Sequence, residues 1–100
     1  MNVDVNVEQS IRLEEITFCK YQLTTVNKNI VLTFPQLLQL RTNVNKLTFH
    51  ESICDIIDSD NFVLLFVADK QHLIYLDISQ LLQLKEVIDS FFAPVKSVLI

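Results

Sequence analysis

Metal binding is the chemistry that the cysteine and histidine side chains of this sequence could perform. The chain contains two cysteines and two histidines, namely Cys19, His50, Cys54 and His72. His50 and Cys54 are four positions apart, so on a helix both would lie on one face and could contact a single zinc ion. A structural zinc site normally uses two closely spaced pairs of ligands, whereas Cys19 and His72 stand far apart in the sequence. We therefore expect packing or surface positions for these four residues and rank a zinc-binding protein third among the possible functions.

Nucleophilic catalysis is a second chemistry to consider, with Cys54 as the nucleophile and His50 as the base. The transition state would also need backbone N–H donors that stabilise an oxyanion. The chain contains no glycine and no nucleophile-elbow motif. The absence of glycine also removes the loops that hold phosphates and dinucleotides. We therefore predict no catalytic residue, no bound cofactor and no enzymatic activity for this chain.

Acidic side chains outnumber basic ones, with twelve Asp and Glu against eight Lys and Arg and a formal net charge of −4. The basic residues form no run, so the stripe of positive charge typical of nucleic-acid binding is missing. A polybasic membrane patch is missing for the same reason, and no apolar run approaches the roughly 20 residues of a membrane span. Nor do the aspartates show the spacing of a calcium-binding loop, even where they cluster, at Asp55, Asp58, Asp60 and Asp69. We expect neither nucleic acid nor a membrane as a partner.

The first residues of the chain alternate between valine and polar side chains and lack the charged and apolar regions of a signal peptide. The expectation is a cytoplasmic protein whose cysteines are reduced. The strings Phe18–Leu23 and Asn29–Phe34, with the Leu/Gln-rich segment that follows them, resemble small uncharacterised bacterial proteins of about this length. The resemblance spans residues 16–92 and implies a bacterial cytoplasmic protein without an assigned activity.

The elements that must position these residues form an internal repeat. The pentapeptide Gln-Leu-Leu-Gln-Leu occurs at 36–40 and again at 80–84, 44 positions later. The pattern of apolar and polar residues repeats around it, which defines two units at 16–47 and 60–91, joined by a connecting segment at 48–59. Coincidence in a chain rich in leucine and glutamine is the alternative interpretation.

Each unit is predicted to contain two strands followed by a helix. Aromatic and β-branched residues indicate strands at 16–23 and 30–32 in the first unit, and at 61–67 and 73–76 in the second. Because glycine is absent, asparagine is expected at the turn positions that need a positive φ. In the first unit these asparagines are Asn27 and Asn29.

Both helices are predicted to begin at a capping box, Thr33 with Gln36 and Asp77 with Gln80. Apolar residues then recur at helical spacing along one stripe of each helix. The stripes consist of Leu37, Leu40, Val44 and Leu47 in the first helix and Leu81, Leu84, Ile88 and Phe91 in the second.

Three segments lie outside this repeat. Thr48 and Glu51 match another capping box, which predicts a short connecting helix at 49–57. The alternating valines at 3–7 indicate a short N-terminal strand, and the apolar tail at 95–100 could form another strand.

The fold class that follows is α+β. We predict two pseudo-symmetric ββα units that form an antiparallel sheet of four or more strands, with the two main helices on one face. No linker divides the chain, so residues 1–100 are expected to form a single domain.

Exposed leucines and one apolar strand point to a binding surface. Leu38 and Leu82 lie about 100° from the apolar stripes of their helices, at equivalent positions of the repeat. The strand Phe62–Val67 is apolar at every position, so both of its faces need cover, and two helices cover only one. The candidate interface residues are Leu38, Leu82, Phe62, Leu64 and Phe66.

These features favour a non-enzymatic structural or protein-interaction module that acts as a homodimer. A small-ligand-binding regulatory domain is the alternative, ahead of the zinc-binding protein. The alternative to the dimer is a monomer in which the segments at 3–7 and 95–100 fold back across the open face of the sheet.

Overall fold

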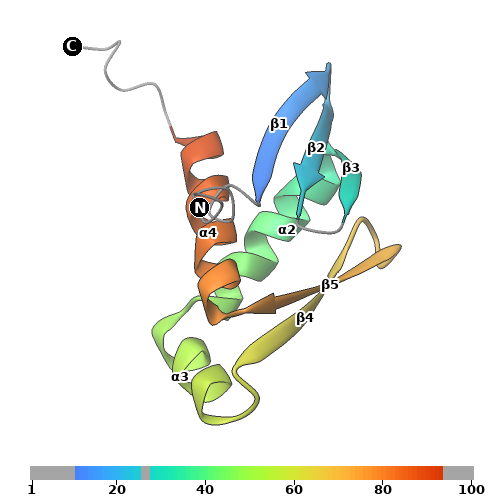
Figure 1. Ribbon diagram of the computed structural model, residues 1–100. Coiled ribbons are helices and arrows are strands. Elements are labelled where there is room, and N and C mark those ends of the chain that lie inside the picture. The colour runs from blue at the N-terminus through green and yellow to red at the C-terminus, as the bar shows by residue number, and fades with distance from the viewer. Residues whose placement is uncertain (1–10, 26–27, 94–100) are drawn as a thin grey trace, which may run out of the picture.

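The computed structural model describes residues 11–25 and 28–93 and has a mixed α+β fold (Figure 1). This confirms the predicted fold class. The described elements, in chain order, are β1 (Arg12–Thr17), β2 (Lys20–Thr24), β3 (Asn29–Thr33), α2 (Phe34–Leu47), α3 (His50–Asp58), β4 (Phe62–Val67), β5 (His72–Asp77) and α4 (Ile78–Phe92).

The described strands form two antiparallel sheets, one with the order β1-β2-β3 and one with the pair β4-β5. The predicted single sheet of four or more strands is therefore not confirmed. β3 and β5 do not pair with each other, and the Lys28 ammonium instead donates a hydrogen bond to the Leu73 carbonyl oxygen at 3.0 Å. A side chain at this position satisfies a main-chain group that a continuous sheet would have used for a ladder bond.

The strand predicted at 16–23 is wrong, because the chain turns in its middle. Phe18 and Cys19 form the turn between β1 and β2, and Cys19 takes a φ of 61°. Asn29 was expected at a positive φ and belongs to β3 instead; Asn27 and the strands predicted at 3–7 and 95–100 lie outside the described residues.

Both main helices begin at the capping boxes that the sequence predicts. The Thr33 hydroxyl accepts from the Gln36 N–H at 3.4 Å, and the Gln36 side chain accepts from the Thr33 N–H at 2.9 Å. Asp77 and Gln80 make the same reciprocal pair at 2.8 and 3.0 Å. Each box satisfies two main-chain donors that the first helical turn would otherwise leave unpaired.

The capping box predicted for the connecting helix is not formed. Thr48 ends α2 instead, and its hydroxyl donates to the Val44 carbonyl oxygen at 2.8 Å. The residue before α3 is Phe49, which makes no side-chain capping bond. The pattern failed because a threonine between two helices can end the first as well as begin the second.

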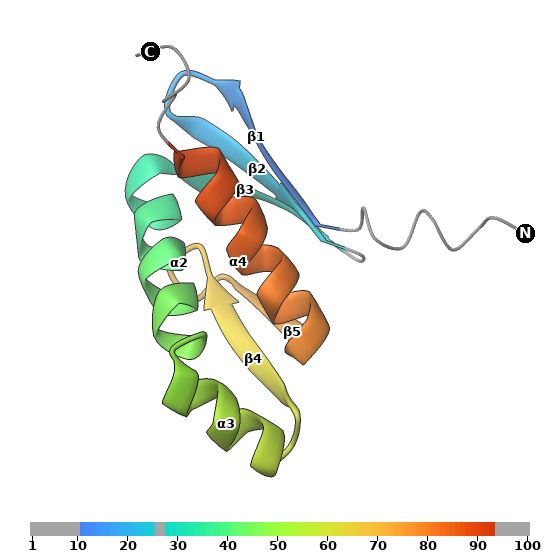
Figure 2. The same cartoon turned by 90° about the vertical axis from the view of Figure 1, so that its left-hand side faces the viewer.

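The core lies where α2 and α4 pack against each other and against both sheets (Figure 2). The predicted stripes supply it, because Leu37, Leu40 and Val44 of α2 and Leu81, Leu84 and Ile88 of α4 are all buried. Leu47 and Phe91, at the ends of the stripes, are partly buried against the same cluster. The inward side chains of the strands complete the core, namely Tyr21, Leu23, Ile30, Leu32, Leu65, Val67, Ile74 and Leu76.

Candidate functional site

The outward side of the β4–β5 hairpin carries the largest group of neighbouring apolar side chains that the described strands leave exposed. Side chains alternate between the two sides of a strand. In β4, Leu65 and Val67 are buried while Leu64 and Phe66 are 56% and 52% exposed. We call this side of the hairpin the outer face, which consists of Phe62, Leu64 and Phe66 of β4 and Leu73 and Tyr75 of β5.

The ladder register brings the two strands of the outer face together. Leu64 lies opposite Tyr75, and Phe66 lies opposite Leu73. Tyr75 and Leu73 are 58% and 41% exposed, and the Phe62 and Tyr75 rings stack with centroids 4.8 Å apart. The face is therefore a continuous apolar surface rather than a set of isolated side chains.

Sequence reasoning selected the β4 residues of this face and missed Leu73 and Tyr75. The signal that could have found them is the alternation in β5, where Ile74 and Leu76 are buried. Residues between two buried positions of a strand point to the opposite side. Their partners across the hairpin depend on the register, which the sequence pattern alone did not supply.

Leu38 and Leu82 lie on separate helices, and their surroundings differ from the outer face. They are 37% and 45% exposed. A shallow surface depression beside Leu82 is lined by charged and polar side chains, including Lys85, Glu86 and Asp89. Lys85 and Asp89 form an ion pair there at 2.9 Å. Leu82 is therefore a single apolar residue in a polar neighbourhood, which is common on protein surfaces.

The cysteine and histidine residues are distributed over several elements. The Cys54 sulfur and the His50 Nε2 atom lie 3.9 Å apart on exposed positions of α3, as their spacing predicts. Cys19 lies in the β1–β2 turn and His72 begins β5. Within 11–25 and 28–93, no group of three or more His, Cys, Asp or Glu side chains is placed to hold a metal ion.

The acidic residues near the strand ends lie in turns or at the end of a helix. Asp69 lies in the β4–β5 turn and accepts a hydrogen bond from the Gln36 side chain at 2.7 Å. Asp58 ends α3, and Asp60 lies in the turn before β4. The Asp69 contact connects the β4–β5 hairpin to the first turn of α2.

Tyr21 is a titratable side chain of the core. It packs against the rings of Phe34 and Phe91, with centroids 6.0 and 5.7 Å away. Burial raises the pKa of its hydroxyl above the ordinary value of 10.0, and the charges of Glu15 and Cys19 raise this pKa further. The shift follows from packing in the core, because removal from water disfavours the charged form.

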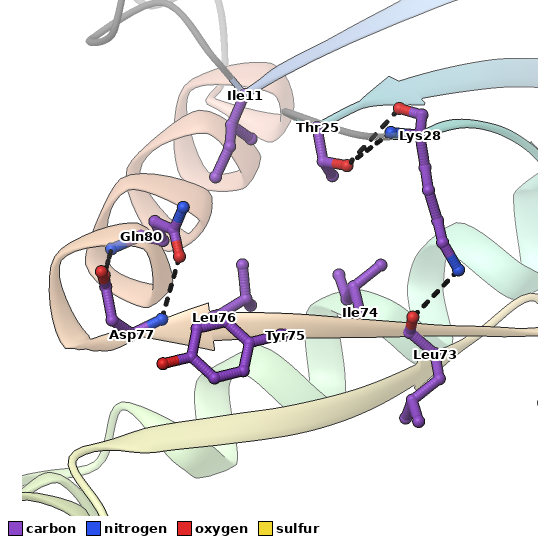
Figure 3. Close-up of a pocket in the computed structure, with 9 residues that line it drawn as sticks. All are labelled: Ile11, Thr25, Lys28, Leu73, Ile74, Tyr75, Leu76, Asp77 and Gln80. Carbon is purple, nitrogen blue, oxygen red and sulfur yellow. Dashed lines mark hydrogen bonds between the residues drawn. The ribbon is translucent and has the colours of Figure 1, made fainter.

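A groove lies along the outer edge of β5, between this strand and the end of the first sheet (Figure 3). Its volume is about 360 Å³. Ile11, Thr25 and Lys28 line one side, and β5 residues from Leu73 to Asp77 line the other. The Lys28 side chain crosses the groove to reach the Leu73 carbonyl oxygen.

Comparison of the chain with protein-family models, with curated proteins and with solved structures finds no match. None of the helices in the described part of the chain is long and apolar enough to cross a membrane.

Proposed function

We propose that this chain is a non-enzymatic protein-interaction module that acts as a homodimer, and that the outer face of β4–β5 is its interface. The exposure of Leu64, Phe66, Leu73 and Tyr75, each above 40%, carries the proposal. Contiguous apolar surface of this kind marks interaction sites, whereas scattered exposed leucines do not.

The β2–β3 hairpin, called the first hairpin below, provides an internal comparison with the β4–β5 hairpin, called the second. Its outward ladder pairs are Gln22 with Val31 and Thr24 with Asn29, where the second hairpin has Leu64 with Tyr75 and Phe66 with Leu73. Both hairpins form antiparallel pairs and bury their inner sides, so pairing alone does not require an apolar outer side. The apolar outer face of the second hairpin therefore supports a separate role in binding.

A second copy of the same chain is the occupant that we favour. In a twofold dimer each copy presents the same patch to its partner, and none of the five outer-face side chains is charged. An apolar patch of this kind is complementary to itself. Burying about 800 Å² per chain is the usual scale of a stable interface, and at about 25 cal/mol per Å² the burial offsets much of the entropy lost on association.

The test is the mass of the protein in solution. Sedimentation equilibrium is expected to give about twice the 11.6 kDa of one chain for the native protein and one chain mass for Leu64→Asp. The matched control is Val31→Asp, because Val31 is 51% exposed on the outward side of the first hairpin and should leave the dimer intact. A monomeric native protein at micromolar concentration, or a control that dissociates as Leu64→Asp does, would contradict the proposal.

We also propose that the two hairpin–helix units are related by internal pseudo-symmetry. The buried residues of α2 and α4 recur 44 positions apart, from Leu37 and Leu40 to Leu81 and Leu84. The two capping boxes recur with the same shift. Superposition of residues 16–47 on 60–91 in an experimental structure tests this relation, and the absence of a common hairpin–helix core would contradict it.

The two free cysteines suit a reducing compartment. Both Cys19 and Cys54 are exposed and unpaired with each other, a state that is stable where glutathione keeps thiols reduced. The free thiols support our proposal of a cytoplasmic location.

The groove beside β5 favours the second candidate function, a small-ligand-binding regulatory domain. Its volume of about 360 Å³ falls within the usual range of ligand pockets. A ligand that binds the folded state raises the unfolding temperature. A thermal-shift screen tests this candidate, and a hit in this groove should lose its effect in Lys28→Ala.

A further inference from the structure

His50 and Cys54 place two metal-ligating atoms side by side on the surface of α3. The Cys54 sulfur lies 3.9 Å from the His50 Nε2 atom, and both residues are exposed. Zinc binds cysteine sulfur at about 2.3 Å and histidine nitrogen at about 2.0–2.1 Å, so in a tetrahedral site these two atoms lie about 3.6 Å apart. The pair therefore needs a movement of only about 0.3 Å to hold a zinc ion.

The charge of α3 also favours a cation. Its nine residues include Glu51, Asp55 and Asp58 and no lysine or arginine. A cluster of one sign of charge raises the local concentration of counter-ions. Because His50 and Cys54 are four positions apart on this helix, the backbone already holds both ligands on one face before the ion arrives.

One chain supplies only half of a structural zinc site. Such sites are four-coordinate, and two cysteines with two histidines are one of the common ligand sets. The other cysteine and histidine of the chain, Cys19 and His72, lie in the β1–β2 turn and at the start of β5. Among the described residues, no third His, Cys, Asp or Glu joins the α3 pair to hold an ion. The two missing ligands must therefore come from another molecule.

A second copy of the chain offers the missing pair at the same spacing. A twofold axis through the ion would bring two α3 helices together, each with one thiolate and one imidazole. α3 lies at the end of the molecule away from the β1–β2–β3 sheet (Figures 1 and 2), so another copy can approach it without meeting that sheet. Ile57, three positions after Cys54 and on the same face of α3, is 51% exposed and would be covered by the second helix.

We propose that His50 and Cys54 form half of a zinc site, which two copies of the chain complete across a twofold axis. Each Cys54 thiol releases its proton to solvent on binding, so the two thiolates balance the charge of the ion. The sequence lacks a second closely spaced pair of ligands, and the second copy supplies it. This inference does not depend on the proposed dimer, because α3 and the outer face are different surfaces.

The test is zinc-dependent association of the full-length Leu64→Asp variant, in which the outer-face dimer should be absent. Without zinc this variant is expected to sediment with the mass of one chain, 11.6 kDa. With zinc(II) and reduced thiols it should sediment with twice that mass and bind one zinc ion per two chains. Cobalt(II) in place of zinc should give the visible absorption of a tetrahedral site with thiolate ligands. The metal content and this absorption report on the zinc site whatever the zinc-free mass is, so a failure of the dimer proposal remains distinguishable.

The two cysteines provide matched variants in the Leu64→Asp background. Cys54→Ser removes a ligand and should keep the mass of one chain when zinc is added. Cys19→Ser changes the other exposed cysteine and should bind zinc and associate as its parent does. His50→Gln and His72→Gln make the same comparison for the histidines, and circular dichroism without zinc checks that each variant is folded.

Three results would overturn the proposal. The first is a mass that zinc does not change. The second is one zinc ion per chain without association, which is expected if water or buffer completes the site. The third is equal zinc binding by Cys54→Ser and Cys19→Ser, which is expected for binding to surface carboxylates.

Discussion

At the scale of single residues, the absence of glycine places ordinary side chains in the left-handed region of backbone space. Ala68, Asp69 and Lys70, three consecutive residues of the β4–β5 turn, have φ values of 59°, 58° and 70°. An L-residue with a Cβ meets a steric cost of about 1–2 kcal/mol there. The flanking β4–β5 ladder and the bond from Gln36 to Asp69 at 2.7 Å hold the turn in this conformation.

Lys70→Gly is expected to raise the free energy of unfolding by about 1 kcal/mol. The steric cost disappears, and the larger entropy of a glycine in the unfolded chain offsets part of the gain. Lys70 is exposed, so little packing is lost. Urea denaturation measures the change, and Lys70→Ala is the control because it keeps the Cβ and should gain nothing. Equal effects of glycine and alanine would show that the turn is not strained.

At the scale of the element, the capping boxes couple each hairpin to its helix. Thr33 ends β3 and caps α2, and Asp77 ends β5 and caps α4. No loop residue separates strand from helix at either place. The capping residue therefore sets both the end of the strand and the direction of the helix, which explains why a local motif was informative about the order of elements.

Asp77→Ala is expected to lower the free energy of unfolding by about 0.5–2 kcal/mol, because the N–H of Gln80 loses its acceptor. Asp77→Asn is the matched control, since asparagine caps helices about as well as aspartate and should cost much less. Thermal unfolding by circular dichroism compares the two variants. A loss in Asp77→Asn as large as that in Asp77→Ala would mean that the carboxylate charge, rather than the cap, carries the effect.

At the scale of the whole molecule, one apolar cluster joins the two hairpins through the helices. The cluster contains Leu23 and Ile30 from the first sheet and Leu65 and Ile74 from the second, together with Leu84 of α4. A cavity within a close-packed cluster removes contacts from all the side chains that line it, so it destabilises every element that contributes to the cluster. We therefore expect the two sheets to unfold together, although they share no ladder hydrogen bonds.

Leu84→Ala is expected to lower the free energy of unfolding by about 2–5 kcal/mol, because Leu84 is fully buried and the cavity left behind adds to the lost burial. Leu82→Ala, two positions away and 45% exposed, should cost less than about 1 kcal/mol. Hydrogen exchange of the Leu23 and Leu65 amides should accelerate by the same factor in Leu84→Ala. Retained protection of Leu23 would show that the two sheets unfold independently.

The sequence pattern identified only some residues of the candidate interface. Phe62, Leu64 and Phe66 were selected because a strand that is apolar at every position must expose one side or be covered. The structure places them with Tyr75 and Leu73, which the pattern did not select because cross-strand partners depend on the register. Leu38 and Leu82 were selected by symmetry. The polar neighbours of Leu82 are Lys85, Glu86 and Asp89, three, four and seven positions further along the same helix, so helical spacing could have shown that its surroundings are polar.

The sequence by itself determined the features that depend on residues close together in the chain. The helix starts at Thr33 and Asp77 and the buried stripe from Leu81 to Ile88 follow from hydrogen bonds and contacts that reach at most one or two helical turns. Only the tertiary structure decided that the strands divide into two sheets and that the outer edge of β5 faces a groove. These outcomes depend on packing between segments that are distant in the chain, such as the contact from Lys28 to Leu73, and local patterns carry no information about which of several distant partners is reached.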